Sequence, residues 1–127
     1  LLPIGYNHGD LTFGNILFSD DIYLIDFLDS YVESPILDIV KLIQETKWKW
    51  SMLISNIDNI RLHQIFEYLN NIIFQTFKDK PFWKHIILFD LINLIRIYPY
   101  LTNKNEKEHI KKYIIQTYEE FNNTNGW

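Results

Sequence analysis

The sequence predicts a mainly α-helical domain with one small β-hairpin near its N-terminus. Beyond residue 34, apolar residues recur every three or four positions over several long stretches, which is the period of an amphipathic helix. Before residue 26, two short apolar runs flank a polar turn, which is typical of a hairpin. The 127 residues, 47% hydrophobic and 22% charged, suit one globular domain spanning residues 1–127.

The hairpin is expected from two apolar runs, 15–18 and 22–25, that are separated by the polar residues 19–21. Ser and Asp favour tight turns because their short side chains bond to the nearby backbone. Most of the glycines come just before this segment: Gly5, Gly9 and Gly14. We therefore expect the unusual backbone of the chain to lie in the loop that leads into the hairpin.

Two helices are predicted in the first half of the helical part. Ser34 and Pro35 begin the first, because Ser is a common N-cap and Pro fits the first helical position. This helix is expected to continue to about Thr46. The second helix is predicted over 58–77, with an apolar stripe formed by Leu62, Ile65, Phe66, Leu69, Ile73 and Phe77.

Two more helices are predicted in the second half. Pro81 begins the third helix and Pro99 stops it. Its segment 86–97 is apolar nearly all round, so we expect it to be buried at the centre of the domain. A last helix over 105–121 is expected to turn Ile110, Ile114, Tyr118 and Phe121 inward. The remaining residues, 122–127, are expected to form a frayed tail.

Composition excludes several classes of function. The net charge is −4, which leaves no basic surplus for nucleic acid. There is no cysteine, so disulfide scaffolds and Cys-ligated zinc are ruled out, and a reducing cytoplasm is the expected location. The densest apolar run, 86–97, is too short and too interrupted by polar residues to span a membrane, so we expect no membrane partner.

One cluster of polar residues indicates chemistry. Asp10 lies in a Gly-flanked loop, Asn15 begins the first strand and Asp26 follows the second. A hairpin brings its two ends together, so Asn15 and Asp26 should be neighbours, with the Asp10 loop beside them. No basic partner lies nearby in the sequence. Convergent oxygen-bearing side chains of this kind suit a hard cation such as Mg²⁺ together with substrate phosphates.

The spacing of this cluster, His8-Gly9-Asp10 with Asn15 and then Ile25-Asp26-Phe27, resembles a known signature. It is similar to the H-G-D-x-x-x-x-N and hydrophobic-hydrophobic-Asp segments of the aminoglycoside phosphotransferase and choline kinase family. The resemblance spans roughly residues 4–43. It implies an ATP- and Mg²⁺-dependent kinase that phosphorylates a hydroxyl of a small molecule, such as choline, an aminoglycoside, a sugar or an amino alcohol.

The resemblance also implies a role for each residue. Asp10 would accept the proton of the substrate hydroxyl, and Asn15 and Asp26 would hold Mg²⁺. His8 would hold the catalytic loop in place without reacting. Asp38, at the start of the next helix, would bond to that loop from behind, although a carboxylate is also favoured there by the helix dipole alone.

At the level of the fold, the chain resembles most of the C-terminal lobe of a protein-kinase-like fold. Residues 1–28 would form the catalytic loop and metal-binding hairpin, and 34–121 the helical part. A nucleotide-binding N-terminal lobe is expected to be absent, because only seven residues precede His8 and no glycine-rich phosphate loop occurs. We expect this chain alone to be an inactive fragment of a longer enzyme, completed by the missing lobe or by self-association. The alternative is a non-catalytic binding or assembly module.

Two sets of residues have open interpretations. Trp48 and Trp50, with Glu45, could line a pocket for a cationic substrate through cation–π contacts, but aromatic packing between helices is the favoured interpretation. Asp90 and Arg96 lie in the apolar helix. They either form structural ion pairs with neighbours or border a substrate cleft.

Overall fold

The computed structural model describes residues 1–124 and confirms a mainly helical protein with one two-stranded hairpin. The strands are β1 (Ile16–Phe18) and β2 (Ile22–Leu24). The helices are α1 (Ile36–Thr46), α2 (Trp50–Ile54), α3 (Ile60–Phe77), α4 (Trp83–Ile97) and α5 (Lys104–Asn123), with short 3₁₀ turns at Phe13–Asn15 and Tyr98–Tyr100.

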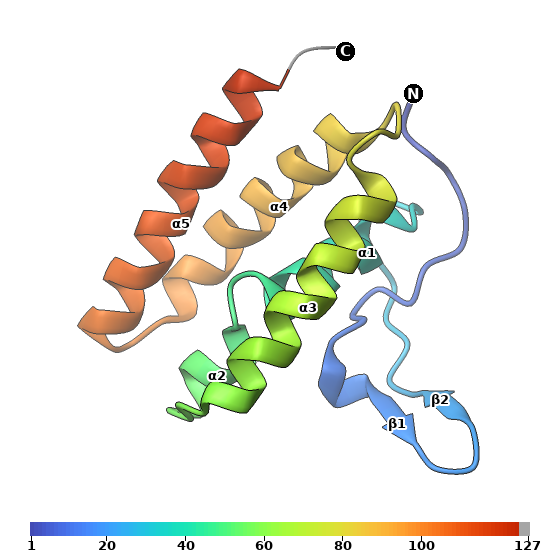
Figure 1. Ribbon diagram of the computed structural model, residues 1–127. Coiled ribbons are helices and arrows are strands. Elements are labelled where there is room, and N and C mark those ends of the chain that lie inside the picture. The colour runs from blue at the N-terminus through green and yellow to red at the C-terminus, as the bar shows by residue number, and fades with distance from the viewer. Residues whose placement is uncertain (125–127) are drawn as a thin grey trace.

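The hairpin forms where the sequence predicts it. The strands pair antiparallel with Ile16 opposite Leu24 and Phe18 opposite Ile22. One residue beyond the ladder, the amide of Ile25 donates to the carbonyl of Asn15 at 3.1 Å. This register sets Asn15 beside the residue that precedes Asp26, so the open end of the hairpin adjoins the Asp10 loop (Figure 1).

Helix α1 begins one residue later than predicted, at Ile36, so Pro35 is the N-cap and not the first helical residue. Ser34 lies just before the cap; its hydroxyl accepts a hydrogen bond from the amide of Ile36 and donates one to the carbonyl of Pro3 at 2.6 Å. Ser34 is fully buried and ties the N-terminal segment to the start of the helix. Ile36, Val40 and Ile43, at helical spacing, then face the core.

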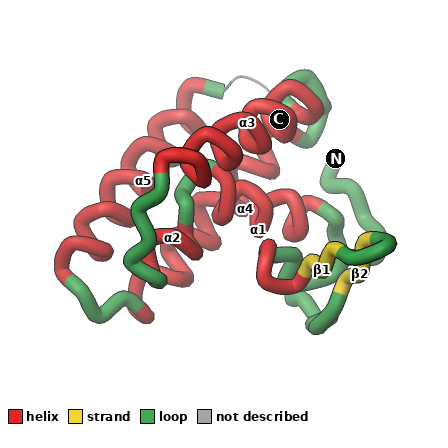
Figure 2. The backbone as a smooth tube through the Cα atoms, turned by 60° about the horizontal axis from the view of Figure 1, so that its bottom comes forward, coloured by secondary structure: helices red, strands yellow, loops and turns green. Residues whose placement is uncertain are grey.

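Helices α1, α4 and α5 enclose the core. Helix α4 packs against both α1 and α5, and α3 lies against the other side of α1 (Figure 1). The fully buried members include Ile36 of α1, Ile86 and Leu94 of α4 and Ile110 of α5. The hairpin lies outside this core, at the N-terminal side of α1 (Figure 2).

Several details of the predicted helices are wrong. Helix α2 was not predicted, because its five residues are too few to show a period. Helix α4 begins after Pro81, at Trp83, and it is not buried all round, since Ile92 and Ile95 lie on a solvent-facing side. Its neighbours α1 and α5 cover only part of its circumference.

The outer helices differ from the expectation in similar ways. In α3, Phe66 is buried while Ile65 is exposed. In α5, Ile110 and Ile114 face the core as expected, but Thr117 is buried and the adjacent Tyr118 is exposed, so the prediction is wrong for Tyr118. The predicted tail at 122–127 is wrong for residues 122 and 123, which are helical; residues 125–127 lie outside the described part of the chain.

Within residues 1–124, no helix is long and apolar enough to cross a bilayer.

Candidate active site

The loop that contains Asp10 is held from behind by helix α1. The carboxylate of Asp38, in the first turn of α1, accepts hydrogen bonds from the backbone amides of His8 at 2.7 Å and Gly9 at 3.0 Å. The two oxygens of one carboxylate thus satisfy two consecutive amides that have no strand or helix partner. The contact expected from the resemblance is present, and it joins the loop rigidly to the core.

The ring of His8 holds the same loop from inside. It is 4% exposed, and its Nε2 lies 2.6 Å from the carbonyl oxygen of Ile25, a pure acceptor, so Nε2 bears the proton. Nδ1 then accepts from the amide of Asp10 at 3.3 Å. The ring also packs on Phe27, with centroids 4.3 Å apart. His8 therefore links the Asp10 loop to the strand that leads to Asp26.

Only glycine fits at position 9, because another segment of the backbone passes very close to it. Its φ is +88°, and a Cβ built there would lie 2.0 Å from the carbonyl oxygen of Leu28. The amide of Leu28 in turn donates to the carbonyl of His8 at 2.9 Å. The segment after the hairpin thus crosses directly over the loop, at a distance that only glycine permits.

The Asp10 carboxylate has two polar partners, the side chains of Asn15 and Lys41. The amide nitrogen of Asn15 donates to the Asp10 carbonyl at 2.8 Å and approaches its carboxylate at 3.3 Å. The Nζ of Lys41 lies 3.0 Å from Asp10 Oδ1. The sequence showed no basic partner near Asp10, but Lys41 comes from α1, 31 positions along the chain. Its spacing of three residues from Asp38, which places both on one helix face, is the signal that would have found it.

Asp26 stands apart from this network. Its backbone adopts a left-handed conformation with φ of 56°, which is uncommon outside glycine but tolerated by Asp. The side chain is exposed, and no residue among 1–124 forms a hydrogen bond or ion pair with its carboxylate. A strained backbone that presents a free carboxylate next to the Asp10 loop is typical of a functional position.

The residues fit the Mg²⁺ site that the resemblance implies. Because the Asn15 amide nitrogen is committed to Asp10, its oxygen remains without a hydrogen bond among the described residues. That oxygen and the free carboxylate of Asp26 form the donor set that Mg²⁺ prefers, two protein oxygens completed by phosphates and water. Within residues 1–124, no group of three or more His, Cys, Asp or Glu side chains could hold a metal by itself.

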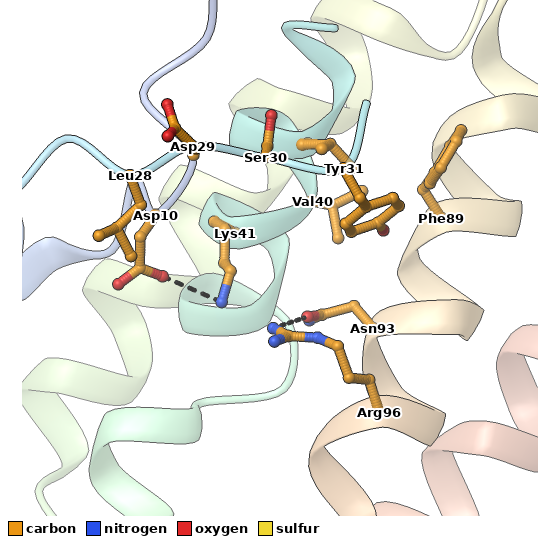
Figure 3. Close-up of a pocket in the computed structure, with 12 residues that line it drawn as sticks. Asp10, Leu28, Asp29, Ser30, Tyr31, Val40, Lys41, Phe89, Asn93 and Arg96 are labelled. Atoms are coloured by element: carbon orange, nitrogen blue, oxygen red, sulfur yellow. Dashed lines mark hydrogen bonds and ion pairs between the residues drawn. The ribbon is translucent and has the colours of Figure 1, made fainter. Parts of the chain in front are cut away.

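A pocket of about 310 Å³ opens beside Asp10 (Figure 3). Its wall is formed by the Asp10 loop, the segment after the hairpin, α1 and α4. The lining residues are Gly9, Asp10, Leu28, Asp29, Ser30, Tyr31, Leu37, Val40, Lys41, Phe89, Asn93 and Arg96. Of the two open interpretations of Arg96, the structure therefore favours the cleft.

Asp90 is not part of that cleft. It is buried, and both carboxylate oxygens accept from the indole Nε1 of Trp48, at 2.9 and 3.1 Å. Burial raises its pKa from 3.8 to about 7, opposed by the Trp48 hydrogen bond and by Lys47, while Glu120 raises it further. Asp90 thus forms a buried hydrogen bond, where the sequence left open an ion pair or a cleft.

The three residues considered for cationic substrates do not line this pocket. Trp48 is 1% exposed and stacks on Tyr113 as well as bonding Asp90, so aromatic packing accounts for it. Trp50 packs against the core at the start of α2. Glu45 is buried and accepts a hydrogen bond from Ser51 at 2.5 Å; burial raises its pKa, and nearby Asp10 adds to that effect.

A loop held around a pocket-facing carboxylate, next to two free oxygen donors, defines a site suited to phosphoryl transfer. In agreement, the model of the phosphotransferase enzyme family (APH) matches residues 1–67. The match covers more than half of the chain and includes the entire loop, hairpin and α1. The chain belongs to this family, and the resemblance seen in the motif is confirmed at that level. No curated protein and no solved structure matched the chain.

Proposed function

We propose that the protein is a small-molecule kinase that transfers the γ-phosphate of ATP to a hydroxyl group. The observation that supports this most is the position of Asp10. Its loop is held by Asp38 and His8, its carboxylate faces a pocket large enough for a small molecule, and Asn15 and Asp26 lie on the hairpin beside it. Choline, aminoglycosides, sugars and amino alcohols are the acceptor classes to test.

The reaction would proceed by positioning and charge stabilisation. Asp10 accepts the proton of the acceptor hydroxyl while the hydroxyl oxygen bonds to the γ-phosphorus. The bond from that phosphorus to the bridging oxygen breaks, and ADP leaves. Lys41 keeps the Asp10 carboxylate oriented before the acceptor arrives. When bound through Asn15 and Asp26, Mg²⁺ would neutralise charge on the phosphates.

The decisive experiment measures acceptor-dependent formation of ADP by the full-length protein with Mg²⁺ and ATP. Asp10→Asn should lower kcat by about 100-fold or more, because the base is lost while the amide keeps the size of the side chain. Asp20→Asn, at the far end of the hairpin, is the matched control and should retain full activity. If Asp10→Asn equals the unaltered protein, or Mg²⁺–ATP does not bind, the proposal fails and a non-catalytic binding module becomes the better interpretation.

We also propose that a second body covers the hairpin in the working enzyme, either a nucleotide-binding lobe or another copy of the chain. Large apolar side chains are exposed along both strands and just after them: Leu17, Phe18, Ile22, Tyr23, Leu24, Ile25, Phe27 and Leu28. A contiguous apolar patch of this kind is typical of a contact surface. It lies beside Asp26, where the phosphates would bind.

A further inference from the structure

The pocket beside Asp10 is lined by charges of both signs. Asp10 and Asp29 lie on one side of it, and the side chain of Arg96 extends from α4 toward Lys41 (Figure 3). Lys41 is paired with Asp10. Arg96 has no carboxylate partner among residues 1–124, although the chain is acidic overall with a net charge of −4.

Arg96 is held in place by a short chain of buried amides. The amide oxygen of Asn93 accepts from Arg96 at 3.1 Å, and the Asn93 nitrogen donates to Gln44 at 2.8 Å. Gln44 and Asn93 are 3% and 5% exposed. Two buried amides thus orient one guanidinium nitrogen, and the remaining N–H donors of the fork stay available at the pocket.

Apolar side chains form another part of the pocket wall, which suits the carbon frame of a ligand. Tyr31 and Phe89 pack against each other with ring centroids 6.5 Å apart, and Val40 also lines the pocket. Burial raises the pKa of Tyr31, so its hydroxyl stays neutral next to Arg96 and leaves the guanidinium charge uncompensated. Arg96 is an exposed residue that also lines the pocket, so its guanidinium is accessible to a ligand from solvent.

From this arrangement we infer that the acceptor carries an oxyanion, a phosphate or carboxylate, which Arg96 binds while the acceptor hydroxyl reaches Asp10. A guanidinium fork matches the planar geometry of such oxygens and can bind two of them. The inference rests on the proposed transfer at Asp10, where the hydroxyl proton passes to Asp10 and ADP leaves. It favours anionic hydroxy compounds over cationic acceptors such as choline and the aminoglycosides.

Binding alone gives the first test, and it is independent of catalysis. The 127-residue sequence has two arginines, Arg61 and Arg96, and the variants Arg61→Gln and Arg96→Gln assign their Nε–H signals in the ¹⁵N-labelled protein. Inorganic phosphate should shift the Arg96 signal and leave that of Arg61, on α3 and outside the pocket, unchanged. Equal shifts at both arginines, or none at Arg96, would overturn the inference.

Turnover gives the second test. Glycerol 3-phosphate and glycerate are compared with glycerol, three hydroxy compounds that differ in their oxyanion, in the presence of Mg²⁺ and ATP. Arg96→Gln should lower kcat/KM for the preferred anionic acceptor by about 10- to 100-fold, Arg96→Lys should restore part of it, and the ATP KM should stay constant. Arg61→Gln is the matched control and should change nothing.

The outcomes separate this inference from the proposed function. If Asp10→Asn abolishes transfer but Arg96→Gln leaves the acceptor preference unchanged, the kinase assignment stands and the anion subsite is wrong. If Arg96→Gln raises the ATP KM for every acceptor, Arg96 serves the nucleotide and the inference is also overturned. If phosphate shifts the Arg96 signal but the protein has no transferase activity, Arg96 binds an anion and the proposed reaction is wrong.

Discussion

At the scale of single residues, the site combines side chains that hold the loop with side chains that have no protein partner. His8 uses both ring nitrogens and Asp38 both oxygens to hold the loop. The Asn15 amide oxygen and the Asp26 carboxylate have no hydrogen bond among residues 1–124. Asp26 is exposed, so its carboxylate is open to solvent, and both residues have oxygens available to a cation.

Asp26 provides a prediction at this scale. Asp26→Asn keeps the size of the side chain and its tolerance of the left-handed backbone, but removes the charge. Turnover should fall by about 100-fold or more, while the free energy of unfolding changes by less than about 0.5 kcal/mol because no contact is lost. Steady-state kinetics and urea unfolding measure the two effects. Normal turnover in this variant would remove Asp26 from the metal site.

At the scale of elements, helix α1 organises the site through one face. Asp38, Lys41 and Glu45 follow each other at intervals of three and four residues, so they share that face. Asp38 bonds the loop, Lys41 pairs with Asp10, and Glu45 is electrostatically coupled to both Lys41 and Asp10. The opposite face of the same helix supplies Ile36, Val40 and Ile43 to the core. Core packing therefore sets the position of the catalytic loop.

The role of Asp38 can be separated from a simple helix-dipole effect. Asp38→Ala leaves two loop amides unsatisfied and should lower the free energy of unfolding by about 1–3 kcal/mol. It should also reduce kcat, because the Asp10 loop loses its support. Glu106→Ala is the matched control, since Glu106 lies in the first turn of α5 and contacts no loop. Chemical denaturation and steady-state kinetics of both variants measure the two effects. Equal losses of stability and kcat in Asp38→Ala and Glu106→Ala would mean that Asp38 acts through the helix dipole alone.

At the scale of the whole molecule, buried Asp90 couples stability to pH. Its pKa is about 7 in the folded state, against an ordinary value of 3.8. Between pH 3.8 and about pH 7, the Asp90 carboxyl is protonated in the folded state but ionised in the unfolded state. The contribution of Asp90 to stability is therefore highest below about pH 4, falls as the pH rises to about 7, and then levels off.

Asp90→Asn should remove this dependence, because an amide oxygen can still accept from Trp48 and does not ionise. The unaltered protein should lose roughly 4 kcal/mol of unfolding free energy from this group between pH 4 and pH 8, and the variant much less. Urea unfolding at the two pH values measures the difference. Asp79→Asn, at an exposed position, is the control and should follow the unaltered protein. Parallel curves for all three proteins would contradict the prediction.

The exposed hairpin provides a second prediction at this scale. Phe18 and Ile22 are cross-strand partners that are 77% and 61% exposed. The 127-residue chain should self-associate through this surface, as sedimentation velocity can show. The combined changes Phe18→Lys and Ile22→Glu should give a monomer, since opposite charges across the strands preserve the hairpin. Tyr100→Lys, at an exposed aromatic residue outside the hairpin, is the control and should leave the self-association unchanged. A monomeric unaltered chain would contradict the expectation.

The sequence by itself determined the class of fold, the hairpin, most helix boundaries and the spacing of His8, Asp10, Asn15 and Asp26. These are local properties: a strand register brings Asn15 next to Ile25 whatever the rest of the chain does, and a helical period appears within one turn or two. The family assignment follows from the same short-range pattern, which is why the motif was sufficient for it.

Only the tertiary structure decided which side chains meet across the core. Lys41 with Asp10, Trp48 with Asp90 and Gln44 with Asn93 are pairs separated by 31, 42 and 49 positions. Such contacts depend on the rotation and crossing of packed helices, which also decide that Thr117 is buried and the adjacent Tyr118 is exposed. The charge along the pocket, and with it the expected class of acceptor, arises from that packing because its cations come from α1 and α4.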